Sequence, residues 1–333
     1  MKDISPILKV KDLHVEFDTY GGVVKAVRGV SFDVNYGLTT AVVGESGCGK
    51  SVTVQSMMGL IPTPPGKITS GEAILEGQDI LKNKTIKGKD IRGSKIGMIF
   101  QDPMTSLNPT MKIGDQVAET IQVHLGLSHA ASFKKAISLL DMVQIPDAKQ
   151  RAHQYPFELS GGMLQRSMIA MAVACEPEIL IADEPTTALD VTIQSQILTM
   201  LSEMQKERGM AIILITHDLG VVAEMADDVL VMYAGEIVEK GNVNEIYNNS
   251  SHPYTIGLKE AMPSNEKNHS KKLMPIDGSP PDLFSPPIGC GYFDRCPLAM
   301  NICEEKTPPI FKIEKKHYAN CWAHHKKAPV NIK

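Results

Sequence analysis

The pattern of apolar and polar positions predicts strands at the beginning of the chain. Residues 8–17 and 23–34 alternate between apolar and polar side chains. This alternation is typical of strands that have one exposed face. We therefore expect an N-terminal antiparallel β layer.

Short, largely apolar runs follow at residues 38–43, 179–182 and 211–216. Segments compatible with helices lie between them, for example residues 191–207. Strands that are apolar on both faces and alternate with helices are typical of a parallel sheet. The pattern predicts an α/β fold with a mixed or parallel core sheet.

Two further segments modify this picture. Apolar residues recur at helical spacing from Met111 to Phe157, which predicts an inserted helical subdomain over about residues 102–166. Residues 229–232 and 237–239 flank Ala234-Gly235, so we expect a hairpin near the edge of the sheet.

Length and charge bound the class of protein. The chain has 333 residues and a net charge of −4, which suggests a large domain at 1–250 with a smaller module at 251–333, and argues against a generally basic surface for nucleic acid. Lys, Asn, Ser and Pro become frequent from Met262, which predicts a linker there. No apolar run reaches the roughly 18 residues of a membrane span. Residues 1–10 also lack the apolar stretch of a signal peptide, so we expect a cytosolic chain that reaches a membrane only through partners.

A glycine-rich segment carries the first chemistry. It reads Gly44-Glu45-Ser46-Gly47-Cys48-Gly49-Lys50-Ser51 and lies between an apolar strand and a helix. In that context G-x-x-x-x-G-K-S predicts a loop whose backbone N–H groups bind phosphates, with Lys50 on the outer phosphates and Ser51 on Mg²⁺. An ordinary glycine turn is the alternative, and the Lys-Ser pair favours a nucleoside triphosphate over a dinucleotide. The predicted nucleotide ligands are Gly44, Glu45, Ser46, Gly47, Cys48, Gly49, Lys50, Ser51 and Val52.

The second half of such a site is predicted at the ends of later strands. Asp183 and Glu184 follow the apolar run at 179–182. We expect Asp183 to bind Mg²⁺ and Glu184 to polarise the attacking water. His217 follows the next strand and is a candidate for the γ-phosphate region, although an ordinary hydrogen-bonded histidine is the alternative.

The order of these motifs resembles one family. Leu159-Ser160-Gly161-Gly162 lies between Gln101 and Asp183 and resembles the signature loop of ABC transporter ATPases. The resemblance runs from about Leu8 to Asn249 and implies an ABC-type P-loop NTPase domain at 1–250. It also implies further roles: Gln101 in catalysis and Mg²⁺ binding, Glu184 and His217 in catalysis, Tyr20 stacked on adenine, and Ser160, Gly161, Gly162 and Asp190 in nucleotide binding.

The resemblance further implies that two such domains close head to tail around ATP. The signature loop of one chain then completes the phosphate site of the other. Met163 departs from the family, which usually has Gln at this position. A thioether cannot replace an amide hydrogen bond, so this position predicts weaker contacts.

The terminal module narrows the subfamily. The segments His252-Pro253-Tyr254-Thr255 and Phe293-Asp294-Arg295-Cys296 resemble the extension of peptide-importer ATPases, with D-type subunits of dipeptide and oligopeptide permeases as the near match and nickel importers close by. Cys290, Cys296, Cys303 and Cys321 crowd this module. Four cysteines in a reducing compartment favour a metal site over disulfides. By resemblance this site is a [4Fe–4S] cluster, with Zn²⁺ as the alternative and unliganded thiols as a third reading.

These observations predict a subunit that hydrolyses ATP to energise the import of short peptides. The implied partners are a second ATPase subunit (an F-type relative or a second copy), two transmembrane permease subunits and, through the complex, an extracytoplasmic binding protein. The implied location is the cytoplasmic face of the membrane. Import of nickel or another small solute is one alternative, and a soluble ABC ATPase acting on nucleic acid or ribosomes is another.

Overall fold

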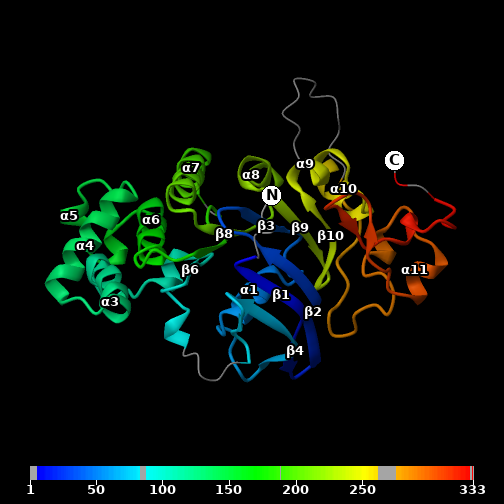
Figure 1. Cartoon of the computed structure of the whole chain (residues 1–333), viewed down its shortest axis with the longest axis horizontal. Coiled ribbons are helices and arrows are strands. Elements are labelled where there is room, and N and C mark those ends of the chain that lie inside the picture. Colours follow the sequence, from blue (N-terminus) through cyan, green and yellow to red (C-terminus); the bar gives the residue numbers. More distant parts are fainter. Residues whose placement is uncertain (1–5, 83–87, 188, 262–274, 331, 333) are drawn as a thin grey trace. The chain divides into compact units, whose positions relative to one another are not determined.

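The computed structural model describes residues 6–82, 88–187, 189–261, 275–330 and 332 (Figure 1). The chain divides into two compact units. The first comprises residues 1–34, 40–82 and 216–333, and the second comprises residues 35–39 and 83–215. The linker predicted from Met262 lies largely outside the described residues.

An antiparallel sheet opens the first unit, as the alternating pattern predicts. Its strand order is β2-β1-β4-β5. The long strands β1 and β2 pair from Leu8 opposite Val34 to Thr19 opposite Gly22. The strands are β1 (Leu8–Thr19), β2 (Gly22–Val34), β4 (Gly66–Leu75) and β5 (Gln78–Asp79).

A mixed sheet forms the rest of the first unit. Strand β9 pairs in parallel with β3, every residue of which is buried, and antiparallel with β10. The predicted hairpin is confirmed, but β10 is not an edge strand because β12 of the C-terminal module pairs with it. The strands are β3 (Thr39–Val43), β9 (Asp228–Tyr233), β10 (Glu236–Asn242), β11 (Phe311–Lys312) and β12 (Tyr318–Ala319). The helices are α1 (Lys50–Met57), α8 (Leu219–Met225), α9 (Val243–Asn248), α10 (Pro253–Glu260) and α11 (Asn301–Glu305).

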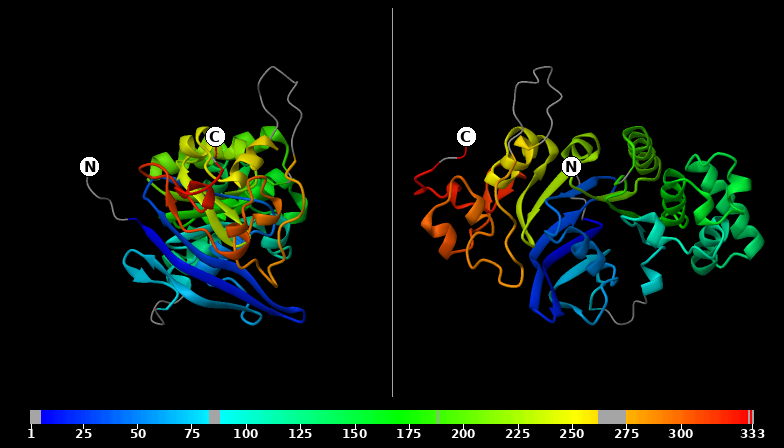
Figure 2. Two further views of the ribbon diagram at one scale, coloured as in Figure 1. Left: turned by 90° about the vertical axis from the view of Figure 1, so that its right-hand side faces the viewer. Right: turned by 180° about the vertical axis from the view of Figure 1, so that it is seen from behind.

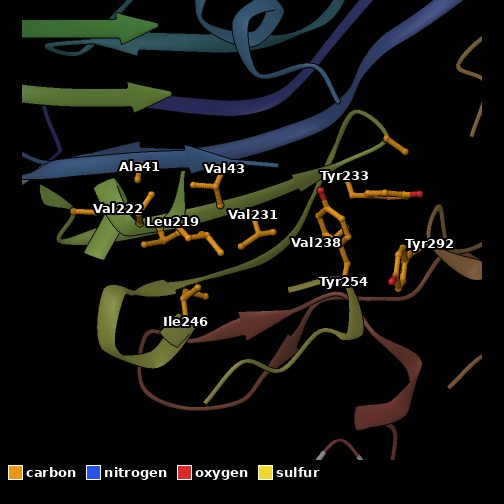
Figure 3. Packing of buried hydrophobic residues seen from close by; sticks show 13 residues of the cluster. Ala41, Val43, Leu219, Val222, Val231, Tyr233, Val238, Ile246, Tyr254 and Tyr292 are labelled. Carbon is orange, nitrogen blue, oxygen red and sulfur yellow. The ribbon is translucent and has the colours of Figure 1, made fainter. Parts of the chain in front are cut away.

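The C-terminal module shares the hydrophobic core of this first unit. Tyr292, from the cysteine segment, joins a cluster that includes Val231 of β9 and Tyr254 of α10 (Figure 3). The ring of Tyr233 lies 4.5 Å from that of Tyr254 and 5.2 Å from that of Tyr292, measured between centroids. Aromatic rings at such distances attract each other in addition to burying area. The module is therefore packed against β9 and β10.

A parallel sheet and a group of helices make up the second unit. The sheet order is β6-β7-β8, and all residues of these strands are buried. The helices α2 to α6 lie between β6 and β7 in the chain, as predicted, and α3 to α6 gather beside one another in Figures 1 and 2. The strands are β6 (Ile96–Ile99), β7 (Ile179–Asp183) and β8 (Ala211–Thr216). The helices are α2 (Pro103–Ser106), α3 (Ile113–Leu125), α4 (His129–Met142), α5 (Ala148–Arg151), α6 (Gly161–Ala172) and α7 (Val191–Arg208).

Within the described ranges, no helix has both the length and the apolar character needed to span a membrane.

Candidate functional site

The glycine loop connects β3 to α1 and is held in a conformation that requires glycine. Gly44, Gly47 and Gly49 have φ angles of 155°, 79° and 99°. A Cβ on Gly44 would lie 2.2 Å from the carbonyl oxygen of Met232, and one on Gly49 would lie 2.4 Å from that of Ala26. No atom within 4 Å would meet a Cβ on Gly47, so that residue borders open space. The loop is a rigid turn that leads into the N-terminus of α1, a geometry suited to an anion.

Lys50, the first residue of α1, is folded back onto this loop. Only 5% of the residue is exposed, and its Nζ donates to the carbonyl oxygens of Gly44 (2.8 Å) and Glu45 (2.9 Å). Burial raises the pKa of the neighbouring Cys48 thiol by more than the charge of Lys50 lowers it. Cys48 is therefore a protonated packing residue at neutral pH. The loop therefore holds one buried cation against its own carbonyl groups.

Tyr20 lies at the tip of the turn between β1 and β2. Its side chain is fully exposed. The ring of Phe284 comes within 3.4 Å of the position that a Cβ on the neighbouring Gly21 would take. Tyr20 thus has the open face that a stacking partner needs, and Phe284 supports the turn.

Two predicted catalytic residues of the second unit, Gln101 and Glu184, are in direct contact. The Oε2 atom of Glu184 accepts hydrogen bonds from Gln101 Nε2 (3.0 Å) and from Thr187 Oγ1 (2.9 Å). The backbone of Glu184 has a φ of 47°. Asp183, the preceding residue, ends β7 and is 2% exposed. The carboxylate of Glu184 is therefore directed by its neighbours on both sides.

The signature segment forms the start of α6. Ser160 is the N-cap, and its Oγ accepts from the backbone N–H of Met163 at 3.4 Å. A Cβ added to Gly161 would meet no atom within 4 Å, so the backbone there is open to a partner. Asp190 caps α7 in the same way, accepting from the N–H of Ile193 at 2.9 Å. Both caps place an oxygen acceptor and a helix N-terminus together.

His217 lies in the first unit, directly after β8. It is exposed and precedes Asp218, which caps α8 by accepting from the N–H of Gly220 at 2.7 Å. Its position at the end of a buried strand agrees with the prediction from the sequence.

The four cysteines of the C-terminal module are partly or fully buried. The pKa values of Cys290 and Cys321 are raised to about 12, mainly by burial and in part by neighbouring cysteines. The backbone N–H of Cys290 also donates to the carbonyl of Cys303 at 2.6 Å. The segments that carry Cys290 and Cys303 therefore lie side by side.

Comparison with known proteins decides the family. A family model described as "ABC transporter" matches residues 27–187, and one described as "Oligopeptide/dipeptide transporter, C-terminal region" matches residues 238–303. The oligopeptide transport ATP-binding protein OppD of Bacillus subtilis is 52% identical over 98% of this chain and 91% of its own length. The dipeptide transport ATP-binding protein DppD of the same organism is 52% identical over 97% of this chain and 96% of its own length.

The chain belongs to the ATP-binding subunits of oligopeptide and dipeptide ABC transporters.

Solved structures agree with this assignment. A dimeric ABC transporter cassette, MJ0796, has a TM-score of 0.64 and 26% identity, covering 71% of this chain and 98% of that one. The protein cbiO1 of Clostridium perfringens, described as part of an ABC transporter complex, has a TM-score of 0.61 and 30% identity, covering 77% and 94%. The fold is thus the α/β fold of ABC-type P-loop NTPases, with one antiparallel and one mixed sheet, and ATP and Mg²⁺ are the ligands expected for this ATPase family.

The iron–sulfur prediction for this ABC subunit is not confirmed. Among the residues that the structure describes, no group of three or more His, Cys, Asp or Glu side chains is arranged to hold a metal ion. The module is tied to the rest of its unit by the β10–β12 pairing and by the core contact of Tyr292. These two contacts attach the module to its unit.

Two residues that contact the nucleotide loop could not be predicted from the sequence. The backbone N–H of Glu45 donates to Tyr254 Oη (2.8 Å), and its carboxylate pairs with Arg295 (2.8 Å). These residues lie 209 and 250 positions further along the chain. Both occur in segments that resemble the peptide-importer extension, but no spacing in the sequence indicates that they return to the loop.

Proposed function

We propose that this chain binds and hydrolyses ATP to energise the import of short peptides across a membrane. The proposal rests on sequence identity. Over nearly its whole length, the chain is 51–52% identical to ATP-binding proteins of oligopeptide and dipeptide transport. The intact set of ATP-hydrolysis motifs supports an active ATPase. No comparable observation supports nickel import or a role on nucleic acid or ribosomes.

The glycine loop is proposed to hold the phosphates. Lys50 exchanges its bonds to the Gly44 and Glu45 carbonyls for bonds to the outer phosphates, which carry full negative charge. Ser51 would hold Mg²⁺, and backbone N–H groups of the loop other than that of Glu45, which donates to Tyr254 Oη, would contact the phosphate chain. Tyr20 stacks on adenine, because its exposed ring offers a face that tolerates any base.

The second unit and His217 are proposed to supply the chemistry of hydrolysis. Asp183 would be a ligand of Mg²⁺, Glu184 would take the proton of the attacking water, and His217 would contact the γ-phosphate region. Gln101 binds Mg²⁺ or the water. Its hydrogen bond to Glu184 supports this role, because a change in the position of Gln101 would alter the position of the Glu184 carboxylate, the proposed base.

A second ATPase subunit is proposed to complete each site. Ser160, Gly161, Gly162 and Asp190 would contact the nucleotide bound by the partner, which is an F-type relative or a second copy of this chain. The dimeric form of the MJ0796 cassette, also solved with ADP and Pi, supports this arrangement. Met163 leaves the N-cap bond of Ser160 intact, so the anion-binding end of α6 is retained.

The segment from Asp102 to Pro109 is proposed as the docking site for a membrane subunit. Asp102 caps the short helix α2, and the side chain of Gln116 binds both the N–H of Asn108 (2.8 Å) and its carbonyl (2.9 Å). A segment braced in this way can receive a helix without collapsing. This contact would bring the chain to the cytoplasmic face of the membrane, with two permease subunits and an extracytoplasmic binding protein in the same complex.

The four cysteines are proposed as ligands of a [4Fe–4S] cluster, with Zn²⁺ as the alternative. Four thiolates suit either group, and the backbone hydrogen bond from Cys290 to Cys303 brings the segments of two of these cysteines together. The thiols must lose protons and reorient to bind a cluster. Iron, sulfide and zinc analysis of anaerobically purified protein tests this proposal, and stoichiometric zinc without iron would contradict the cluster.

The decisive experiment for function is isolation of the intact complex from its natural membrane. We expect two permease subunits to co-purify and short peptides, delivered by the binding protein, to stimulate ATP turnover. ATPase activity that responds to nucleic acid and needs no membrane partner would overturn the proposal.

A further inference from the structure

The second residue of the nucleotide loop is bound at every polar group. The N–H of Glu45 donates to Tyr254 Oη (2.8 Å), its carboxylate accepts from Arg295 Nη1 (2.8 Å), and its carbonyl accepts from Lys50 Nζ (2.9 Å). Two of these three partners come from the C-terminal segment, and the third is the lysine proposed to bind phosphate. Glu45 therefore connects the C-terminal segment to Lys50.

Arg295 is itself held firmly in place. Its side chain is 6% exposed, and its Nη1 also donates to Tyr233 Oη (3.1 Å). Its Nε and Nη2 donate to the carbonyls of Asp277 (2.9 Å) and Ile276 (3.3 Å). Burial alone would lower the pKa of Arg295, but the hydrogen bonds with Glu45 and Tyr233 raise it overall. The guanidinium thus stays charged and has a single well-defined orientation.

The orientation of Arg295 depends on the turn that carries it. This turn is the 3₁₀ helix Phe293–Arg295, in which the N–H of Phe293 donates to the carbonyl of Cys290 (3.1 Å). The N–H of Cys296 closes the same turn on the carbonyl of Phe293 (3.1 Å). Arg295 is the last residue of this turn, so a change at Cys290 or Cys296 that alters the turn would shift the backbone that carries its side chain.

A shift of Glu45 would directly change the position of Lys50 in the proposed phosphate site. The carbonyls of Gly44 and Glu45 set the resting position of Lys50 Nζ, the cation proposed to bind the outer phosphates. Binding sites of this kind depend on placement to within about 0.5 Å. Small movements of the turn are therefore sufficient to change nucleotide affinity.

We propose that Arg295 is a positioning residue of the nucleotide site, and that through Glu45 it makes ATP affinity depend on the conformation of the turn between Cys290 and Cys296. The proposal rests on the proposed function, in which Lys50 and the loop bind the phosphates. The simpler reading is that Arg295 only anchors the C-terminal segment. The two readings differ in whether the effect of Arg295 on ATP passes through Glu45.

A double-mutant cycle on the full chain separates these readings. Affinity for Mg·ATP is measured by calorimetry for wild type, Arg295→Met, Glu45→Ala and the double variant. We expect Arg295→Met to weaken binding roughly five- to fiftyfold, a range typical of coupling between sites. If Arg295 acts through Glu45, the double variant should bind Mg·ATP no more weakly than whichever single variant binds it less tightly. Arg295→Lys should recover part of the affinity, because it restores the charge but not the planar fork.

Thermal unfolding of each variant and a matched control complete the design. Lys259→Met removes another cation of the C-terminal segment, one that lies on α10 and donates to the Tyr247 carbonyl and the Ser250 hydroxyl. This variant should leave ATP affinity unchanged. The proposal is overturned if the losses of ATP affinity in the two single variants multiply in the double variant. It is also overturned if Arg295→Met lowers Tm but binds ATP as tightly as wild type. If Arg295→Met does not fold, Arg295→Lys and Glu45→Ala alone decide, because unchanged affinity in both refutes it. A wild-type chain that binds no ATP refutes the proposed function instead.

Discussion

Replacement of Glu184 by Gln separates the chemical role of this residue from its structural role. Two hydrogen bonds that Glu184 accepts, from Gln101 and Thr187, converge on a single oxygen, Oε2. The amide oxygen of a Gln can occupy that position and accept both. The backbone N–H of residue 184 keeps its bond to the carbonyl of Ile215 at 2.9 Å. The variant should therefore fold with the same local geometry.

The magnitudes of the two effects differ clearly. Two charge-assisted bonds become neutral ones, and since Glu184 is only half-buried we expect a folding cost of about 1 kcal/mol. Loss of a general base costs about 10² to 10⁴ in turnover, or about 3–5 kcal/mol in the barrier. The catalytic effect should dominate, because the amide cannot accept a proton but preserves shape.

The assay compares three quantities for Glu184→Gln. Peptide-stimulated ATP turnover of the assembled complex should fall by about two orders of magnitude or more, because loss of a general base costs at least about a hundredfold in rate. ATP affinity of the full chain should stay close to that of wild type, and Tm should change little.

Thr187→Val provides the matched control for this experiment. It removes one donor to Glu184 but leaves the carboxylate, so turnover should fall by at most about fivefold, the equivalent of one hydrogen bond. Near-normal hydrolysis by Glu184→Gln, or a loss in Thr187→Val as large as in Glu184→Gln, would refute the assignment of the base.

Three further predictions concern the loop and the C-terminal segment. Lys50→Ala removes a buried cation and should weaken ATP binding roughly a hundredfold, measured by calorimetry, and unchanged affinity would count against the phosphate role. Tyr254→Phe leaves the Glu45 N–H without its acceptor and should lower the free energy of unfolding by about 1–2 kcal/mol in urea titrations, whereas an unchanged midpoint would contradict the contact. Burial, and then the charge of His324, lower the pKa of His252 from 6.5 to about 3. The unfolded chain therefore binds more protons between these pH values, and stability should fall as the pH drops from 6.5 toward 3, by as much as about 5 kcal/mol. In His252→Asn, which keeps an acceptor for the N–H of Tyr254, urea titrations at several pH values should show a smaller loss, and an identical pH slope would exclude His252 as its source.

The sequence by itself determined the features that depend on short segments. Alternation predicts β1 and β2 because one face of a strand is buried, and continuous apolar runs predict β7 and β8 because both faces are buried. The glycine loop was also predictable, since positive φ angles and a close backbone approach restrict Gly44 and Gly49 to glycine. Spacing places Asp183 and Glu184 at a strand end, but it does not show which side chains direct the carboxylate.

Only the tertiary structure decided how distant segments meet. The two-residue strand β12 carries too little pattern to be predicted, and it forms because β10 offers it an unpaired edge. The bond from Gln101 to Glu184 and the pair of Arg295 with Glu45 join residues 83 and 250 positions apart. Such pairings depend on how whole elements pack, and local sequence does not encode them. The link between the nucleotide loop and the C-terminal module follows from that packing.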